Sequence, residues 1–349
     1  MRLEIRENMP IWVQGLAPII AIFISLLLCS LLIIWAGKPV LESYALLIKG
    51  ALGSSFALSE TLTRATPLIF TGLAAAIAFK AKLWNIGGEG QFYMGAVLAT
   101  VLGSGLVTLQ PILMIPFLMV TGAFAAGILL LIPTLLKNYL RVDEVVVTLL
   151  LNFIVLLFVN YLLEGPLQDP MSMGWPQGRP IIDEGLLIPI MDRARLHLGF
   201  ILAIVAAIGC WIFMKFTLWG YEIRSVGLNP EAAKFSGINI SRTLIITALL
   251  SGGMAGIAGV SEVAGLKGYL TLDMSPGFGY AGIAVAMLAM LHPLGVIASA
   301  IFFAGIYVGA DSMSQGMGIP SYIADVMVAV SILMVLVSIL LVRYRVIKG

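Results

Sequence analysis

The residues of this chain that could contact a polar solute are few, and one group of them lies in the segment LWNIGGEGQF, Leu83–Phe92. Asn85, Glu89 and Gln91 carry amide or carboxylate groups, which form hydrogen bonds, and glycines interrupt the segment between them. Irregular backbone at membrane depth is tolerated only where protein or a water-filled cavity covers it. The segment therefore predicts a broken or re-entrant stretch beside a translocation path or gate. The alternative is a tight turn at the interface, with Glu89 in solvent and paired with Lys82.

Two asparagines form a second polar group, Asn152 and Asn160, inside a long apolar run. Because they are eight residues apart, a helix would place them roughly on one face. They would either hydrogen-bond a solute or join neighbouring helices. Together with Asn85, Glu89 and Gln91, they are the predicted residues of the path or gate.

A third feature is the polar segment 229–237, NPEAAKFSG, which carries complete start and stop signals for a helix of about two turns over residues 230–236. It has an N-cap asparagine, a proline at the first helical position, an acid in the first turn, a lysine near the end and a glycine after it. These residues are Asn229, Pro230, Glu231, Lys234 and Gly237.

So short a helix is marginal alone in water, so we expect it to be stabilised by docking. The small side chains of Ala232 and Ala233 would leave a surface that a partner can approach closely. The alternative is a connector that is capped only for its own stability.

Other chemistry is excluded by what the sequence lacks. The phosphate-binding pattern GxxxxGK[ST] occurs nowhere, so this chain cannot itself hold nucleotide phosphates in a P-loop, and energy for transport must come from elsewhere. Two histidines and two cysteines, the latter inside apolar runs, give no metal centre and no disulfide framework. We therefore predict a non-enzymatic protein without a cofactor of its own.

Composition shows which elements must position these residues. The chain is 60% hydrophobic and 11% charged, with mean hydropathy +1.05, whereas soluble domains are about 25% charged. A membrane-spanning helix needs about 20 mostly apolar residues. On this basis the sequence predicts an all-α polytopic membrane protein with about ten spans. They are 16–36, 61–80, 90–108, 111–136, 144–163, 199–217, 243–264, 278–291, 294–311 and 322–342.

Basic residues assign the sides of the membrane. With the N-terminus inside, 13 of the 20 Lys and Arg fall in the cytoplasm, six fall outside and Arg64 lies in a span (13 + 6 + 1 = 20), as the positive-inside rule requires. An even number of spans places both termini in the cytoplasm. The loop 218–242 is then cytoplasmic and the long, proline-rich loop 164–198 is outside. Residues 1–349 are predicted to form a single permease domain.

Two of these segments resemble a known family. GLNPEAAKFSGINI, 227–240, resembles the cytoplasmic coupling loop of ATP-binding-cassette (ABC) importer permeases for ribose-like sugars, branched-chain amino acids and nucleosides. NIGGEGQ, 85–91, is similar to a signature of the nucleoside-type permeases in that family, whose systems usually encode a longer and a shorter permease; this chain resembles the longer. The matching positions of the coupling loop are Gly227, Asn229, Pro230, Glu231, Ala232, Ala233, Lys234, Ser236, Gly237 and Ile238.

The resemblance implies a type II importer fold with two pseudo-symmetric halves, for which the similar stretches TGLAAAIAF (71–79) and SGGMAGIAG (251–259) are a weak signal. It implies ATPase subunits that bind ATP and Mg and grip the coupling loop, and a second paralogous permease in a heterodimer, with a homodimer as the alternative. It also implies an extracytoplasmic substrate-binding protein and a place in the bacterial cytoplasmic (inner) membrane.

The predicted function is that of half the translocation pathway of a nucleoside importer. A simple sugar or another small neutral solute is the alternative substrate. An ion-coupled secondary transporter is the less favoured class, because it would need acids buried in the middle of spans, and here the acids cluster at span ends.

Overall fold

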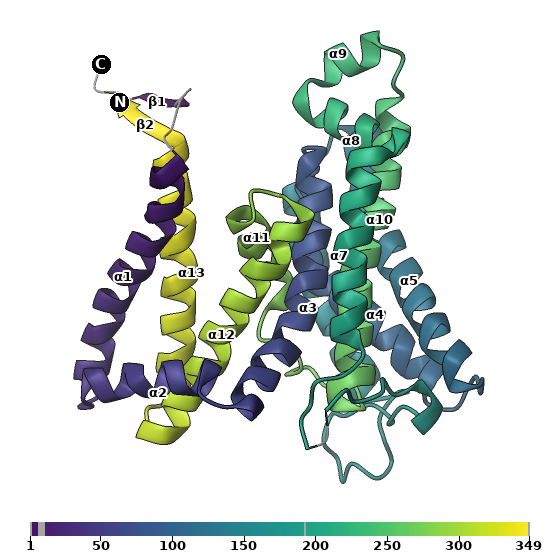
Figure 1. Cartoon of the computed structure of the whole chain (residues 1–349). Coiled ribbons are helices and arrows are strands. Elements are labelled where there is room, and N and C mark those ends of the chain that lie inside the picture. Colours follow the sequence, from purple (N-terminus) through teal and green to yellow (C-terminus); the bar gives the residue numbers. More distant parts are fainter. Residues whose placement is uncertain (1, 6–10, 192, 348–349) are drawn as a thin grey trace. The chain divides into compact units, whose positions relative to one another are not determined.

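The computed structural model describes residues 2–5, 11–191 and 193–347, and nearly all regular structure in them is helical (Figure 1). The helices are α1 (Ile11–Trp35), α2 (Val40–Leu52), α3 (Ser55–Lys80), α4 (Gly88–Gly103), α5 (Pro111–Leu140), α6 (Glu144–Leu163), α7 (Gly199–Phe216), α8 (Leu218–Leu228), α9 (Pro230–Phe235), α10 (Ile240–Glu262), α11 (Phe278–Leu288), α12 (Pro293–Met317) and α13 (Ser321–Arg343). Two short elements, η1 (Asp183–Gly185) and the π-helix η2 (Val263–Lys267), complete the helical part.

Each of the ten predicted spans coincides with one of these helices, so the all-α polytopic class is confirmed. Six described helices are long and apolar enough by themselves to cross a membrane, or seven spans if a bent pair counts as one. Of the other four predicted spans, α1 counts only with α2 as the bent pair, α11 and the Ser321–Met334 part of α13 are shorter apolar helices, and the fourth is α4. It has 16 residues, and 12 of them are buried among neighbouring helices, as expected of a short helix packed inside a larger bundle.

The chain divides into two compact units: unit 1 comprises the described parts of 1–64 and 301–349, and unit 2 comprises residues 65–300. The single domain over 1–349 stays a prediction. In unit 2, α10 packs against α5 and α4 at positions without side chains. A methyl group added to Gly95 would lie 2.1 Å from the carbonyl oxygen of Gly256, and one added to Gly252 would lie 2.6 Å from that of Ala126. Small residues therefore allow these helices their close approach.

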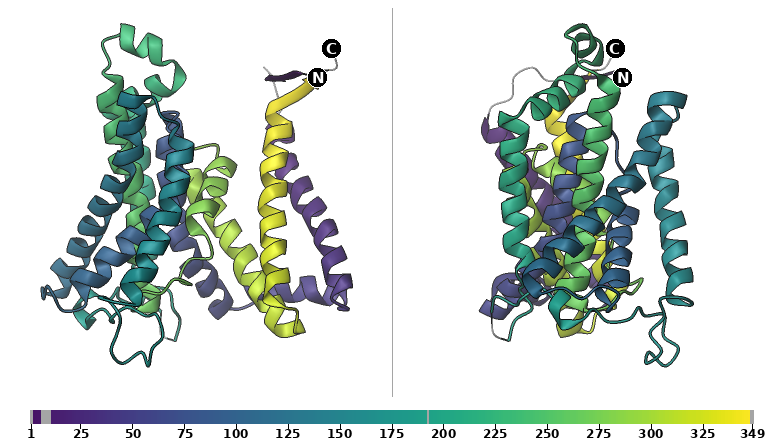
Figure 2. Two further views of the ribbon diagram at one scale, coloured as in Figure 1. Left: turned by 180° about the vertical axis from the view of Figure 1, so that it is seen from behind. Right: turned by 90° about the vertical axis from the view of Figure 1, so that its right-hand side faces the viewer.

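In unit 1, α1 packs along α13, and α2 turns away from the Phe23–Trp35 part of α1 by 118° (Figure 2). Strand β1 (Arg2–Ile5) pairs antiparallel with β2 (Tyr344–Ile347), a small exception to the helical fold. This pairing brings the two strands together, while the placement of both termini in the cytoplasm stays a prediction. Arg64 pairs with Asp311 at 3.2 Å.

The loop between α6 and α7 occupies residues 164–198, as predicted, and backbone hydrogen bonds join it to the segment that follows η2 in the same unit. The amides of Gly178 and Ile181 donate to the carbonyls of Leu270 and Gly268, each at 2.8 Å. The loop ends at His197, which is 2% exposed and accepts at Nδ1 from the amide of Gly199. The loop therefore forms a fixed surface over the end of α10.

Candidate functional site

The break between α3 and α4 is held by a pair of reciprocal amide hydrogen bonds. Asn85 Nδ2 donates to Gln91 Oε1, and Gln91 Nε2 donates to Asn85 Oδ1, both at 2.8 Å. Asn85 also donates to Ser251 Oγ on α10 at 3.1 Å. Both amide side chains are buried, so each replaces lost hydration with protein hydrogen bonds. The predicted broken stretch is confirmed, and protein covers its polar groups.

Asn152 on α6 closes the same network from the other side. Its Oδ1 accepts from the amide of Gly90 at 2.8 Å, and its Nδ2 donates to the carbonyl of Ile86 at 2.9 Å and to the hydroxyl of Tyr280 at 3.0 Å. Asn152 is fully buried. It therefore satisfies backbone groups that the start of α4 leaves without partners within the helix.

Glu89 is buried as well, at 4% exposure, and its Oε2 accepts from the amide of Gly279 on α11 at 2.7 Å. A methyl group on Gly279 would lie 2.1 Å from the amide nitrogen of Glu89, so α4 and α11 touch through backbone here. The alternative of a solvent-exposed Glu89 paired with Lys82 is wrong. Lys82 donates instead to the carbonyl of Leu228 at 3.5 Å.

Four of the five predicted path residues thus lie in one connected region of unit 2. Asn160 does not join them, although it is two helical turns from Asn152. It is half-buried and donates to Glu164 Oε1 at 3.0 Å near the end of α6. The four buried side chains form hydrogen bonds with one another, with backbone groups and with the hydroxyls of Ser251 and Tyr280, and these bonds hold the broken segment in place. Contact with a passing solute stays a prediction for all five.

The predicted short helix is confirmed as α9, and its caps have the expected geometry. Asn229 Oδ1 accepts from the amides of Glu231 and Ala232 at 3.0 and 3.2 Å. Gly237 has φ +84°, and its amide donates to the carbonyl of Lys234 at 3.0 Å.

The amide of Ile238 completes this C-terminal cap by donating to the carbonyl of Ala233 at 3.0 Å. These two bonds form a Schellman motif, which satisfies the last carbonyls of a helix. Pro230, at the first helical position, lacks the amide hydrogen that would have no partner within the helix.

The outer surface of α9 differs from the one predicted. Ala233 is 4% exposed and packs inward, so the expectation that both alanines face a partner is wrong for Ala233, while Ala232 is exposed. The prominent apolar side chains are Phe235, at 96% exposure, and Leu228, at 82%. The sequence carried a signal for Phe235, because it is the single aromatic residue in the polar segment 229–237.

The base of α9 joins it to the rest of unit 2. Ala233 belongs to a buried cluster that also includes Phe79, Val226 and Leu244, from α3, α8 and α10. Gly227 lies against the end of α3, where an added methyl group would be 1.7 Å from the carbonyl oxygen of Lys80. A force applied to α9 would therefore reach α3, α8 and α10 through direct packing.

These features define a class: a polytopic helical membrane subunit that presents a short, capped helix with an exposed aromatic side chain. Residues 57–340 match the family model described as the permease component of branched-chain amino acid transport systems. The chain belongs to this family of ABC transporter permeases, and it is a non-catalytic, multi-pass subunit of an ABC importer. Membership decides against the ion-coupled alternative.

Several characterised relatives are similar over nearly the whole chain. The guanosine ABC transporter permease protein NupP of Bacillus subtilis is 34% identical over 92% of this chain and 92% of its own length. The glucose ABC transporter permease protein TsgB13 of Haloferax volcanii is 31% identical over 99% of this chain and 93% of its own. The nucleoside ABC transporter permease protein NupB of Lactococcus lactis is 32% identical, with 93% and 91% covered. No solved structure matches the chain.

Proposed function

We propose that this chain forms half of the translocation pathway of a nucleoside importer in a bacterial cytoplasmic membrane. It works beside a second, paralogous permease in a heterodimer. Separate ATPase subunits bind ATP and Mg and grip α9, and an extracytoplasmic binding protein delivers the solute. Both termini and α9 lie in the cytoplasm, and the loop 164–198 lies outside.

The observation that carries the coupling role is the geometry of α9. Its capping groups are satisfied within the chain, so it needs no partner to hold its shape, and it nevertheless exposes Phe235 to solvent almost entirely. A large aromatic side chain on a rigid, projecting helix is typical of a protein–protein contact. Its base packs on three other helices, which is what the transmission of ATPase closure would require.

The choice of nucleoside rests on two relatives whose names state nucleoside or guanosine transport. A sugar is the second candidate, because the glucose permease of Haloferax volcanii matches 99% of this chain. The uncharged side chains of Asn85, Gln91 and Asn152 are compatible with either neutral solute.

The proposed heterodimer has support in how the relatives occur. Bacillus subtilis has two guanosine permeases among them, NupP and NupQ, and Lactococcus lactis has two nucleoside permeases, NupB and NupC. This chain matches the first of each pair over more than 90% of its length, but matches NupQ over 71% and NupC over 70%. It therefore has the form of one member of such a pair.

The test is uptake of radiolabelled guanosine and glucose by cells that express the chain with its cognate second permease, ATPase and binding protein. We expect ATP-dependent uptake of guanosine that excess unlabelled adenosine inhibits and excess glucose does not. Uptake of glucose without uptake of guanosine would favour the alternative that the substrate is a sugar.

Coupling is tested in the same cells with two substitutions at the end of α9. Gly237→Val forces a branched side chain into left-handed backbone and should fray the helix, whereas Gly237→Asn tolerates this conformation. No atom lies within 4 Å of a side chain added here, so neither variant should disturb insertion. We expect Gly237→Val to lower uptake several-fold and Gly237→Asn to retain it. Equal uptake by both variants and the parent would contradict the coupling role of α9.

A further inference from the structure

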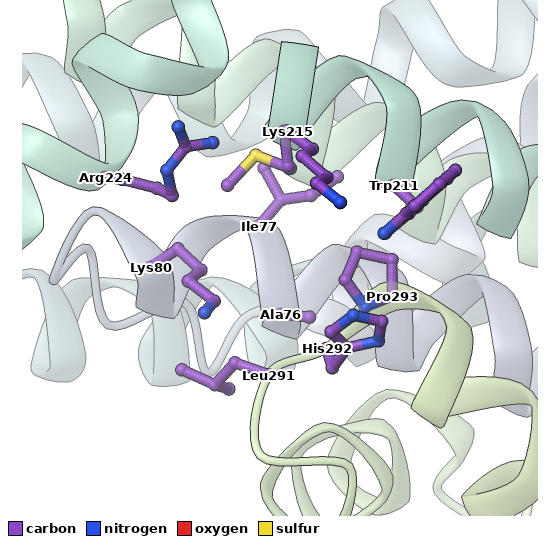
Figure 3. A pocket seen from close by; sticks show the side chains of 10 residues that line it. Ala76, Ile77, Lys80, Trp211, Lys215, Arg224, Leu291, His292 and Pro293 are labelled. Atoms are coloured by element: carbon purple, nitrogen blue, oxygen red, sulfur yellow. The ribbon is translucent and has the colours of Figure 1, made fainter.

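A basic cavity lies at the end of unit 2 where α3 and α7 terminate. Its volume is about 220 Å³, and α3, α7, α8 and the turn between α11 and α12 line it. Figure 3 shows Lys80, Lys215 and Arg224 arising from three different helices around the cavity, with the ring of His292 on the side of the α11–α12 turn. These residues are not adjacent in sequence, so the fold alone gathers them.

No acidic side chain of the described residues forms an ion pair with the cations of this cavity. None of its lining residues is acidic, and the ion pairs found among the described residues involve other cations. The acid closest in sequence to Arg224 is Glu222, which accepts from the hydroxyl of Thr243 at 3.4 Å. Cations gathered beside one another in a partly desolvated site repel, and an anion between them would relieve that repulsion.

Aromatic and apolar surface borders the cationic groups. The Nζ of Lys215 lies 5.2 Å from the ring centroid of Trp211, within the range of a cation–π contact. Phe216 and Leu218, which follow directly in the chain, are exposed. Tryptophan with flanking lysine and arginine is typical of the boundary between headgroups and acyl chains. The cavity therefore opens beside a surface suited to lipid.

Size restricts the ligand further. At about 30 Å³ for each water, the cavity would hold roughly seven water molecules. It is smaller than the roughly 300 Å³ at which pockets for drug-sized ligands begin. The cavity itself therefore has room for a compact anionic group, and a larger molecule would extend out of its opening.

We propose that this cavity binds a phosphate group, supplied either by an anionic phospholipid or by free phosphate. Lys80, Lys215 and Arg224 would neutralise the phosphate, while Trp211 and the neighbouring apolar surface would contact a glycerol backbone or acyl chain. Basic pockets between membrane helices on the cytoplasmic side are suited to such headgroups. The inference rests on the proposed function in one respect, the assignment of this end to the cytoplasmic leaflet. Because α8 leads directly into α9, an occupied site would fasten the base of α9 to α3 and α7.

Native mass spectrometry of the full chain in detergent provides the test, with titrations of phosphatidylglycerol, phosphatidylcholine and inorganic phosphate. We expect phosphatidylglycerol to bind more tightly than phosphatidylcholine. The double variant Lys80→Gln/Arg224→Gln should bind it roughly 30-fold more weakly, and Lys215→Gln about fivefold more weakly. Arg242→Gln is the matched control, since Arg242 is an exposed cation at the start of α10 outside the cavity. It should change binding less than twofold.

The titrations with the lipids and with inorganic phosphate distinguish the two sources of the phosphate group. Binding of inorganic phosphate that the double variant loses, without any preference for phosphatidylglycerol, would identify the free anion as the ligand and support the site. Equal binding of both lipids without phosphate binding, or equal binding by the parent and both cavity variants, would overturn the proposal. If the double variant does not fold, Lys215→Gln decides. Uptake by the assembled transporter is measured separately. Intact uptake without specific binding of either phosphatidylglycerol or inorganic phosphate would overturn this inference alone, and specific binding at the cavity without uptake would overturn the proposed function alone.

Discussion

At the scale of the residue, Gly227 shows how tightly α8 is joined to α3. A methyl group at this position would lie 1.7 Å from the carbonyl oxygen of Lys80, and a backbone atom cannot rotate away as a side chain can. We predict that Gly227→Ala lowers the free energy of unfolding by about 1–3 kcal/mol, the usual cost of overpacking, because the end of α8 must move. Thermal unfolding of the detergent-purified chain measures it as a lower Tm.

The matched control for that prediction is Gly209→Ala in α7. No atom lies within 4 Å of a side chain added there, and alanine favours a helix over glycine by up to about 1 kcal/mol. Its Tm should equal or exceed that of the parent. An unchanged Tm for Gly227→Ala would mean that α8 does not rest on α3.

His197 makes stability depend on pH. Burial lowers its pKa from 6.5 to about 4, so the unfolded chain takes up the proton at a higher pH than the folded chain does. The contribution of neutral His197 to the free energy of unfolding is therefore fully present above pH 6.5. It is lost as the pH drops from 6.5 to 4, by about 3 kcal/mol in all. His197→Asn keeps an acceptor for the amide of Gly199 but does not titrate. The fall in Tm between pH 7 and pH 5 should be smaller in this variant, and an equal fall in both would refute the assignment to His197.

At the scale of the element, α9 is a rigid support for one exposed aromatic side chain. Because Phe235 is 96% exposed, Phe235→Ala should leave the Tm of the isolated chain unchanged. If the side chain is buried against the proposed ATPase partner, its loss should weaken ATPase binding by at least about 2 kcal/mol, roughly 30-fold. Co-purification and binding titrations with the cognate ATPase measure this effect. Trp175→Ala, which removes a 75% exposed ring from the loop 164–198, serves as the control and should bind normally. ATPase binding by Phe235→Ala at the parental affinity would remove Phe235 from the interface.

The same element shows which features a sequence can predict. The start, stop and length of α9 follow from contacts within a few residues, such as Asn229 with Ala232 and Gly237 with Lys234, so local signals sufficed. The inward orientation of Ala233 depends on Phe79 and Leu244, which are remote in sequence. The burial of Glu89 likewise depends on the amide of Gly279, 190 residues away. Pattern alone cannot supply such tertiary partners.

At the scale of the whole molecule, apolar composition located every predicted span on a helix but did not distinguish spans from buried helices. A helix surrounded by protein and one surrounded by lipid are both mostly apolar, so a search for apolar runs selected the buried α4 together with α5. Helix α2 was not predicted. Gly37, at φ +71°, and Pro39, at its N-cap, mark the sharp bend before α2, and a turn there was compatible with a loop.

The arrangement of the whole chain across the membrane yields the last prediction. The excess of basic residues predicts that α9 lies in the cytoplasm and that the loop 164–198 lies outside. We therefore expect Trp175→Cys to react with a membrane-impermeant maleimide in intact cells, and Phe235→Cys to react only after permeabilisation. Both parent side chains are highly exposed, so access depends on the membrane, and the native Cys29 and Cys210 are buried and should give little background. Labelling of Phe235→Cys in intact cells would place α9 where no cytoplasmic ATPase can reach it, and the coupling mechanism would then be impossible whatever solute the transporter carries.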